Sequence, residues 1–346
     1  VLPPDINASA WRFEPVDGKR IRYGLGGIKG TGEQAVAAIV AAREAGGPFR
    51  DLTDLCARVD KRIVNRRVIE ALVKGGAFDS VDRRRATLFA SIGNALAEAE
   101  RAQAQAAQVS LFGDAAAAPA HVLVETRDWT EAERLQHEKA ALGFYLSGHL
   151  FDAYADEVRR IARGAIADLV DGREPQLLAG IVTDPRTVAG QRGRMFIFKL
   201  DDGSEAIEAF AGEEVFEDRR ELMQEDQLVV VQGRLQPDRF AGGLRLNVMQ
   251  VWDLPAARAR FGRYMAVDVG GVAPPVADVL RLWPARCVSS EHGDLTQGLA
   301  VRLRLHRREA TAELDLGEEV RFWPSDEALG RWRSIAQGGM ATIVYD

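Results

Sequence analysis

The residues best suited to chemistry in this sequence are placed to hold a phosphate backbone. Residues 28–35 follow an apolar-x-Gly-x-Gly pattern that runs into an amphipathic helix. Glycines let a phosphate approach the main chain, and the following helix N-terminus offers free N–H groups and a positive dipole end. Contact with duplex DNA, without sequence reading, is therefore predicted for Lys29, Gly30, Thr31 and Gly32. The alternative is a glycine-rich helix connection that binds nothing.

A block of basic residues follows this turn in the sequence. Lys61, Arg62, Arg66 and Arg67 are predicted to bind duplex DNA, because cations that contact phosphates release counterions. The alternative is a solvated helix face whose cations pair with nearby acids, Asp60 and Glu70 among them. Together the turn and the block fit a helix-hairpin-helix domain.

The hydrophobic period changes to two between residues 176 and 252. Strands are expected at residues 177–182, 194–200, 206–210, 228–235 and 245–251, with a helix at 213–223. Five strands with a helix between the third and fourth is the order of an oligonucleotide-binding (OB) barrel.

Basic and aromatic side chains follow the second strand and the hairpins of this barrel. Aromatic faces stack bases at about 1–3 kcal/mol each, and arginines follow the backbone of a single strand. The predicted single-strand-binding residues are Arg186, Arg192, Arg194, Phe196, Phe198, Lys199, Arg239, Phe240 and Arg245. Phe196 and Phe198 are two residues apart and share one sheet face, so the barrel core is the alternative for this pair.

A short motif lies in an Ala- and Gln-rich stretch. Gln108, Ser110, Leu111 and Phe112 fit a pentapeptide that docks on sliding clamps. Leu111 and Phe112 would fill an apolar pocket, and Gln108 would hydrogen-bond at its rim. The alternative is a helix end that packs on its own domain.

Composition excludes several classes of protein. The 346 residues carry a net charge of −6, so nucleic-acid binding must come from local basic patches. The two cysteines lie far apart in the sequence and the histidines are scattered, so neither a disulfide nor a zinc site is predicted. This cysteine usage fits a protein of the reducing cytoplasm. No apolar run is long enough to span a membrane. Asp201 and Asp202 read as a hairpin turn, so no catalytic residue is predicted. The opening residues suggest a piece of a longer polypeptide.

The order of these parts resembles the C-terminal portion of the alpha subunit of bacterial DNA polymerase III. The resemblance is carried by the barrel strands and by Leu2–Asn7, Tyr23–Glu33, Phe49–Ala57, Asn65–Asp79, Gln108–Gly113 and Glu138–His149. It covers nearly the whole chain, and the last 90 residues or so resemble the family only diffusely.

This resemblance implies a multi-domain α+β fold in four segments. Residues 1–87 would be the fingers tail and the duplex-binding helix-hairpin-helix region, and 88–175 a helical linker with the clamp motif. Residues 176–256 would be an OB-fold that binds single strands, and 257–346 a small α/β domain resembling a tau-binding domain. The expected partners are duplex and single-stranded DNA, the sliding clamp and the tau subunit of the clamp loader, without a membrane.

The resemblance also implies an enzyme of which this chain is a non-catalytic part. The parent would be a DNA-directed DNA polymerase, a nucleotidyltransferase, with Mg²⁺ held by palm carboxylates that this chain lacks. No catalytic residue, metal or cofactor is therefore assigned here, and a cytoplasmic, nucleoid-associated location is expected. One alternative is a stand-alone nucleic-acid-binding adaptor with no polymerase parent, which the upstream reading frame would distinguish. Another is a set of protein-interaction modules, which a salt series of DNA binding would distinguish.

Overall fold

A computed structural model describes residues 1–112, 123–172, 174–190, 193–238, 242–270, 275–290, 293–306, 310–317 and 319–345. Side chains at 105–112, 190, 288–290 and 293–294 lie outside that description. The chain forms two compact units, Val1–Leu150 and Phe151–Asp346. Within the described ranges, no helix has both the length and the apolar character that a bilayer crossing requires.

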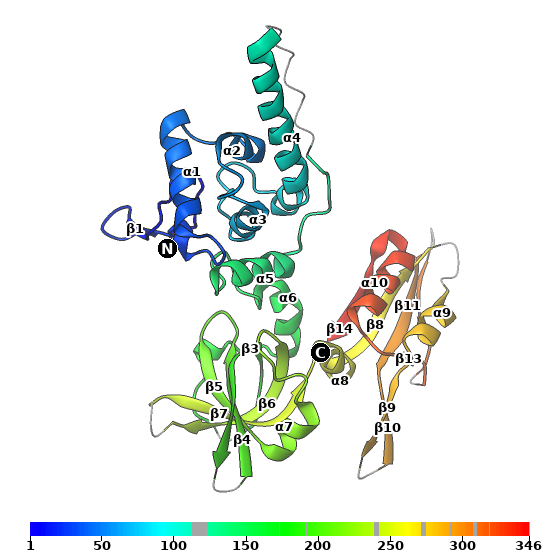
Figure 1. The fold of residues 1–346 in the computed structure, drawn as a ribbon. Helices are drawn as coiled ribbons and strands as arrows, with labels where there is room; N and C mark the ends of the chain where they lie inside the picture. Colours follow the sequence, from blue (N-terminus) through cyan, green and yellow to red (C-terminus); the bar gives the residue numbers. More distant parts are fainter. Residues whose placement is uncertain are drawn as a thin grey trace. The chain divides into compact units, whose positions relative to one another are not determined.

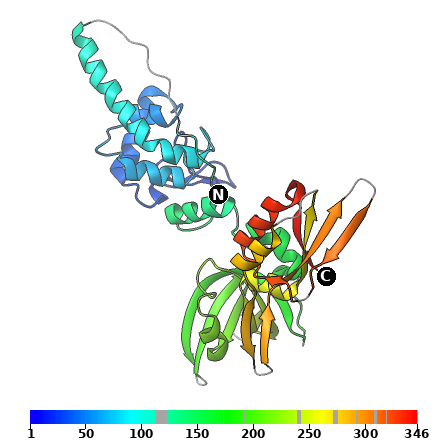
Figure 2. The ribbon, with the colours of Figure 1, turned by 90° about the vertical axis from the view of Figure 1, so that its right-hand side faces the viewer.

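The first unit is helical, with one short hairpin near its start (Figure 1). Its elements are β1 (Glu14–Pro15), β2 (Ile21–Arg22), η1 (Leu25–Gly27), α1 (Glu33–Gly46), α2 (Leu52–Arg58), α3 (Arg66–Lys74), α4 (Arg85–Phe112) and α5 (Glu131–Leu142). Asp51, Asn65 and Thr130 cap α2, α3 and α5 by accepting first-turn amides. The long α4 packs against α2 and α3 (Figures 1 and 2), and the shared core contains Ile28, Ile39, Leu55, Ile69, Leu72 and Phe78.

The second unit contains a closed barrel of five strands in the order β3-β4-β5-β7-β6. Its elements are β3 (Gln176–Gly190), β4 (Gly193–Asp201), β5 (Ala206–Gly212), α7 (Glu213–Arg219), β6 (Leu228–Pro237) and β7 (Leu244–Trp252). The first strand, β3, pairs with both β6 and β4, and a register shift between Thr183 and Arg186 lets it bend between them. A Cβ at Gly180 would lie 2.8 Å from the Asp201 carbonyl oxygen, so glycine permits this close approach of strands.

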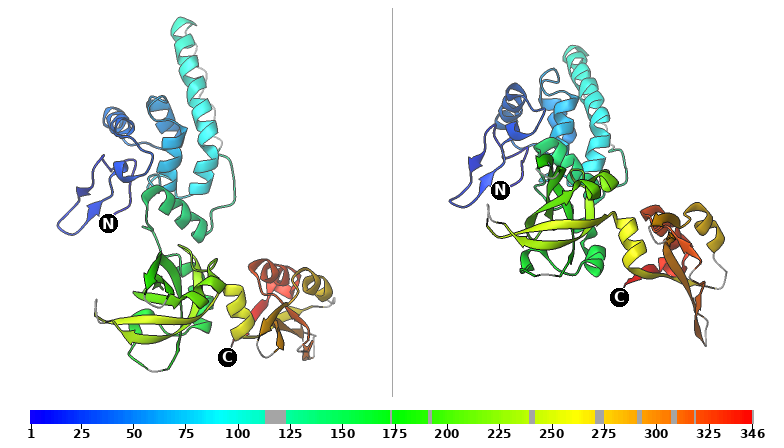
Figure 3. Two further views of the ribbon diagram at one scale, coloured as in Figure 1. Left: turned by 60° about the horizontal axis from the view of Figure 1, so that its bottom comes forward. Right: turned by 90° about the horizontal axis from the view of Figure 1, so that it is seen from below.

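A mixed sheet follows the barrel, in the order β12-β11-β8-β14, with β13 also paired to β11. Its strands are β8 (Gly262–Val269), β11 (Leu299–His306), β12 (Thr311–Asp315), β13 (Arg321–Phe322) and β14 (Ala341–Tyr345), and a separate hairpin joins β9 (Arg286–Ser290) to β10 (Gly293–Gln297). The helices α9 (Val276–Leu282) and α10 (Asp326–Ile335) cover one face of the sheet (Figure 3). Trp332 of α10 is fully buried in the core between helix and sheet, with its ring centroid 5.6 Å from that of Phe322.

A buried arginine ties the helices of this unit to the mixed sheet. Two helices, α6 (Asp152–Ile161) and α8 (Leu254–Phe261), flank the barrel in sequence, and η2 (Ile166–Asp168) follows α6. Arg258 of α8 lies 2.7 Å from each Glu157 carboxylate oxygen, and its third nitrogen lies 2.7 Å from Asp326 Oδ1. Tyr345 donates its hydroxyl to Glu157 Oε1 at 2.8 Å. Burial and the Glu157 carboxylate both raise the pKa of Tyr345, so its hydroxyl stays a donor.

These elements confirm the predicted fold class, since a helical unit is followed by a five-stranded barrel and a smaller mixed sheet. The two compact units are a coarser division than the four predicted segments, whose boundaries stay predictions.

Candidate nucleic-acid interfaces

The glycine turn between η1 and α1 exposes main chain and one cation. Gly30 has a φ of +92°, a backbone conformation that favours glycine, and Lys29, Gly30 and Gly32 are exposed. Gly32 is the N-cap of α1, so the amides of Glu33 and Gln34 have no acceptor within the helix. The turn therefore presents N–H donors beside an ammonium group, with the Glu33 carboxylate at the same helix end.

Thr31 takes a structural position in this turn. It is buried, and its hydroxyl lies 2.6 Å from the Leu25 carbonyl oxygen and 2.7 Å from that of Ile28. Its amide also donates to Ile28. The structure thus contradicts direct DNA contact by Thr31, because its polar groups bond within the turn and fix its shape.

The basic block divides into inward and outward cations. Lys61 is half-buried, and its Nζ lies 3.4 Å from the Leu96 carbonyl oxygen and 3.9 Å from Glu100 Oε1 of α4, so its contact with DNA stays a prediction. Arg66 pairs with Glu70 at 2.8 Å, and Arg62, 92% exposed, lies 3.5 Å from Asp60. Both arginines therefore form the salt bridges of the alternative interpretation, but their side chains remain mostly exposed.

Arg67 lies on the helix that packs beside the glycine turn. A Cβ on Gly30 would lie 3.9 Å from the Ala71 Cβ, so α3 packs beside the turn. Arg67 precedes Ala71 by four residues and shares its helix face, and it is exposed. Lys29, Gly32 and Arg67 thus form one candidate surface, here called the turn surface.

A buried ion cluster holds the other side of the turn. Arg85 donates to Asp79 at 2.8 Å and to Glu138 at 3.1 Å, and Glu138 is 1% exposed. Burial opposes the charge of Arg85, but Asp79 and Glu138 outweigh burial and raise its pKa. Glu138 also accepts from the Ser147 amide at 2.7 Å. This cluster fixes α5, whose Ala141 carbonyl accepts the Lys29 amide at 2.7 Å.

The barrel turns two predicted stacking residues inward. Phe196 and Phe198 are 5% and 1% exposed, and the Phe196 ring stacks on Phe216 with centroids 4.4 Å apart. The structure contradicts base stacking by this pair, because both rings fill the barrel interior, and the core alternative is correct.

A different aromatic residue faces outward. Phe210 of β5 is half-buried, pairs with Ile197 of β4 and Asn247 of β7, and alternates with buried Ala209 and Ala211. The Arg245 guanidinium lies over its ring, 4.9 Å from the centroid. Sequence reasoning missed Phe210, although its alternation with small apolar residues was the available signal.

The other predicted barrel residues lie around Phe210 or outside the described ranges. Arg186 pairs with Glu208 at 2.7 Å, and Lys199 pairs with Asp184 at 2.9 Å and lowers the pKa of that carboxyl. Arg194 is exposed on β4. Arg192, Arg239 and Phe240 lie outside the described residues. We call Lys199, Phe210 and Arg245 the barrel surface.

The clamp motif falls at the end of α4, which continues to Phe112. The side chains of Gln108, Ser110, Leu111 and Phe112 lie outside the described residues, so their role stays a prediction.

The remaining acidic candidates are structural. Asp201 and Asp202 lead into the β4–β5 turn, where Gly203 has a φ of +80°. Asp202 accepts from Arg159 at 2.7 Å and from the Ile166 amide at 3.0 Å. Burial would raise its pKa, but these bonds and those from Ser204 outweigh burial and lower it. Among described residues, no cluster of His, Cys, Asp or Glu is large enough to hold a metal ion.

Replacing Glu138 by Ala is expected to destabilise the first unit by about 3 kcal/mol, because it leaves Arg85 buried with one fewer carboxylate. Urea unfolding followed by hydrogen exchange of the first-unit amides measures this. Glu131→Ala is the control, since its exposed pair with Arg134 contributes less than about 1 kcal/mol. Equal unfolding midpoints for the two variants would contradict the role given to the cluster.

Comparison with known proteins agrees with these two domain types. Residues 1–88 match a family model described as a helix-hairpin-helix motif. Residues 177–254 match one described as an OB-fold nucleic acid binding domain. The helix-hairpin-helix and OB-fold predictions are therefore confirmed.

Curated relatives align with nearly the whole chain. Proteins named DNA polymerase III subunit alpha are 42% identical over 281 residues in Neisseria meningitidis serogroup B (78% of this chain, 24% of the relative). The protein of that name from serogroup A of the same species is 37% identical over 340 residues, which cover 96% of this chain and 29% of the relative. In Escherichia coli K12 the identity is 34% over 355 residues (100% and 30%). The chain thus spans less than a third of the length of these relatives.

Proposed function

Because the chain belongs to the family of DNA polymerase III alpha subunits, we propose that it is the DNA-handling and processivity region of such a subunit. The alignment over nearly the whole chain carries this proposal. The parent would catalyse DNA-templated nucleotidyl transfer with Mg²⁺, and we assign no catalytic residue or cofactor to this chain. A cytoplasmic location on the nucleoid follows from the same proposal.

The turn surface is the proposed contact with product duplex. Its exposed amides and the Lys29 and Arg67 cations suit a phosphate backbone, which accepts hydrogen bonds and carries negative charge. Such contacts position the duplex without reading bases, as a moving polymerase requires.

Reversing both charges, with Lys29→Glu and Arg67→Glu, is expected to weaken duplex binding by about tenfold and to lower the salt slope by about two, because each cation neutralises one phosphate. Fluorescence anisotropy of the full chain with a duplex probe across a salt series measures both. The matched control is Lys19→Glu, an exposed lysine on the β1–β2 connection. Duplex binding that falls equally in the control would count against the turn surface.

The barrel surface is the proposed contact with the single-stranded template. Phe210 and the guanidinium of Arg245 offer stacked planar groups, and Lys199 lies on the neighbouring strand. Planar groups stack on any base, which suits a template of arbitrary sequence.

Phe210→Ala is expected to weaken single-strand binding by about tenfold, the loss of roughly one stacked base, with little change in duplex binding. Anisotropy with an oligothymidine probe measures the change. Phe13→Ala, an exposed aromatic residue of the first unit, should leave it unaltered. If single-strand affinity survives Phe210→Ala, the strand follows another face of the barrel.

We also propose that residues 108–112 dock on the sliding clamp and that residues 257–346 contact the tau subunit of the clamp loader. The support for both is the resemblance to the family, and the Gln-x-x-Leu-Phe pattern adds support for the clamp contact.

Leu111→Ala with Phe112→Ala is expected to abolish clamp binding and leave folding intact, because a short peptide then has neither of its apolar anchors. Surface plasmon resonance with immobilised clamp measures the affinity. Leu282→Ala with Leu295→Ala, two exposed apolar residues of the C-terminal domain, is the control. Unchanged clamp affinity in the first variant would remove the assignment.

A further inference from the structure

The β14 edge of the mixed sheet has no strand beside it among the described residues. Asp268 donates its amide to the Met340 carbonyl oxygen at 2.9 Å, so Met340 and Asp268 form a hydrogen-bonded pair. Such pairs recur at every second residue of an antiparallel ladder, so Thr342 and Val344 also hydrogen-bond to β8. In such a ladder the intervening residues point their N–H and C=O groups the other way. The main-chain groups of Ala341 and Ile343 therefore face the open edge.

The side chains of β14 do not protect this edge. Its sequence, Ala-Thr-Ile-Val-Tyr, contains no charge and no proline, the usual means by which proteins prevent further strand pairing. The opposite edge, β12, carries Glu313 and Asp315, which lie 3.3 and 3.2 Å from Arg302. The two edges of one sheet thus differ in how readily they accept another strand.

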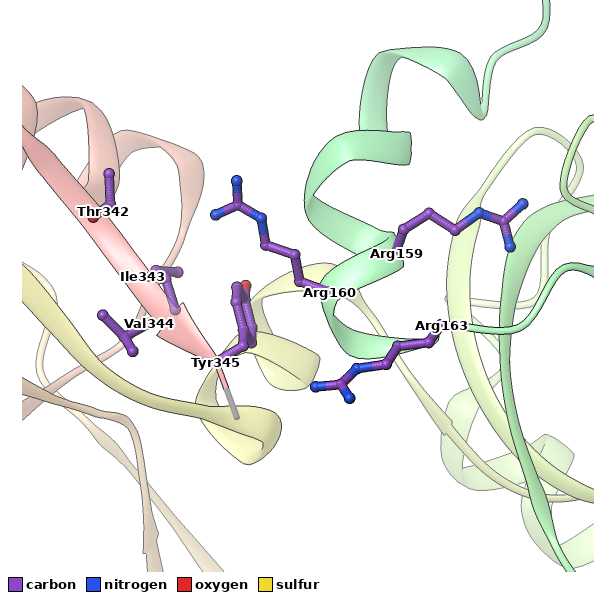
Figure 4. A pocket seen from close by; sticks show the side chains of 7 residues that line it. All are labelled: Arg159, Arg160, Arg163, Thr342, Ile343, Val344 and Tyr345. Atoms are coloured by element: carbon purple, nitrogen blue, oxygen red, sulfur yellow. The ribbon is translucent and has the colours of Figure 1, made fainter.

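A basic groove runs along the unprotected edge. It has a volume of about 530 Å³ and is lined by residues 342–345 and by three arginines. Figure 4 shows Arg160 and Arg163 extending from the end of α6 toward β14, whereas Arg159 points to the other side, where it binds Asp202. An adjoining hollow of about 220 Å³ adds Arg333.

The adjoining hollow has two acidic side chains in its lining, Asp156 and Glu157. Glu157 is engaged by Arg258, at 2.7 Å, and by Tyr345. Asp156 lines the hollow together with Arg160 and Arg333. Arg160 is exposed, so the groove presents a guanidinium beside an open strand edge.

We propose that this groove binds an extended acidic peptide of another protein, which adds a strand to β14 and places a carboxylate against Arg160. A peptide main chain supplies both donors and acceptors, as the edge at Ala341 and Ile343 requires. A phosphate backbone only accepts, so nucleic acid would leave the edge carbonyl groups unpaired. The inference stands on the groove itself and holds whether or not the tau subunit binds this domain.

The test uses the full chain and a fluorescein-labelled decapeptide of alternating Glu and Val. Arg160→Glu is expected to weaken peptide binding by about tenfold, since a charge-assisted contact becomes repulsive. Arg331→Glu, an exposed arginine of α10 away from the groove, is the matched control and should leave binding unchanged. Circular dichroism melting checks that the variants fold.

Two further measurements separate strand addition from simple charge attraction. Alternate N-methylation of the peptide should weaken its binding by about tenfold, because it removes strand hydrogen bonds but no charge. Bound peptide should slow hydrogen exchange at Ala341 and Ile343 more than at Thr342 and Val344, which already pair with β8. The proposal is overturned if the peptide does not bind, if a Lys-Val peptide binds equally well, if methylation has no effect, or if oligothymidine and not the peptide protects these amides.

Discussion

Closing five strands into a barrel fixes the direction of every side chain on them, and much of the proposed single-strand interface depends on this constraint. The interior takes one side of each strand, and β4 supplies Phe196, Phe198 and Leu200 to it. The intervening Lys199 must then face outward, and the ladder register places Phe210 on the same outer side. Aromatic residues of one barrel therefore differ in role according to whether their side chains face the interior or the outside. Phe196 and Phe198 face the interior and stabilise the fold, whereas Phe210 lies half-buried on the outer side.

In the first unit the corresponding constraint is a buried charge. A guanidinium inside a protein is tolerated only when its hydrogen bonds are made to opposite charges, and Arg85 has Asp79 and Glu138 for this purpose. The same Glu138 accepts main-chain amides after α5, so the cluster fixes the helix that receives the Lys29 amide. The exposed turn is thus held in shape by residues that face away from the proposed DNA. A phosphate site made of backbone amides needs this rigidity, because its donors cannot be repositioned by side-chain rotation.

Sequence patterns predicted the elements that alternate or repeat regularly. The five barrel strands lie within a few residues of expectation, apart from the longer β3, because turn signals and two-residue alternation mark their ends. The central strand β8 was not predicted, since Met265, Ala266 and Val267 are all buried and show no alternation. Alternation also states which residues share a face but not which face is inward, so it could not place Phe196 or Phe210. The contact of Lys61 with α4 depends on residues distant in sequence, and no local pattern contains that information.

The net charge of −6 is compatible with DNA binding because exposed cations can gather locally on an acidic chain. Arg85 and Arg258 are buried against carboxylates and hold elements together, so they contribute structure and little external field. The cations that remain exposed, such as Lys29, Arg67 and Arg160, lie beside main-chain groups that can hydrogen-bond. Charge then supplies attraction that weakens with salt, and the main chain supplies direction. Recognition built this way follows the backbone of a partner, which suits the proposed contacts with DNA of any sequence.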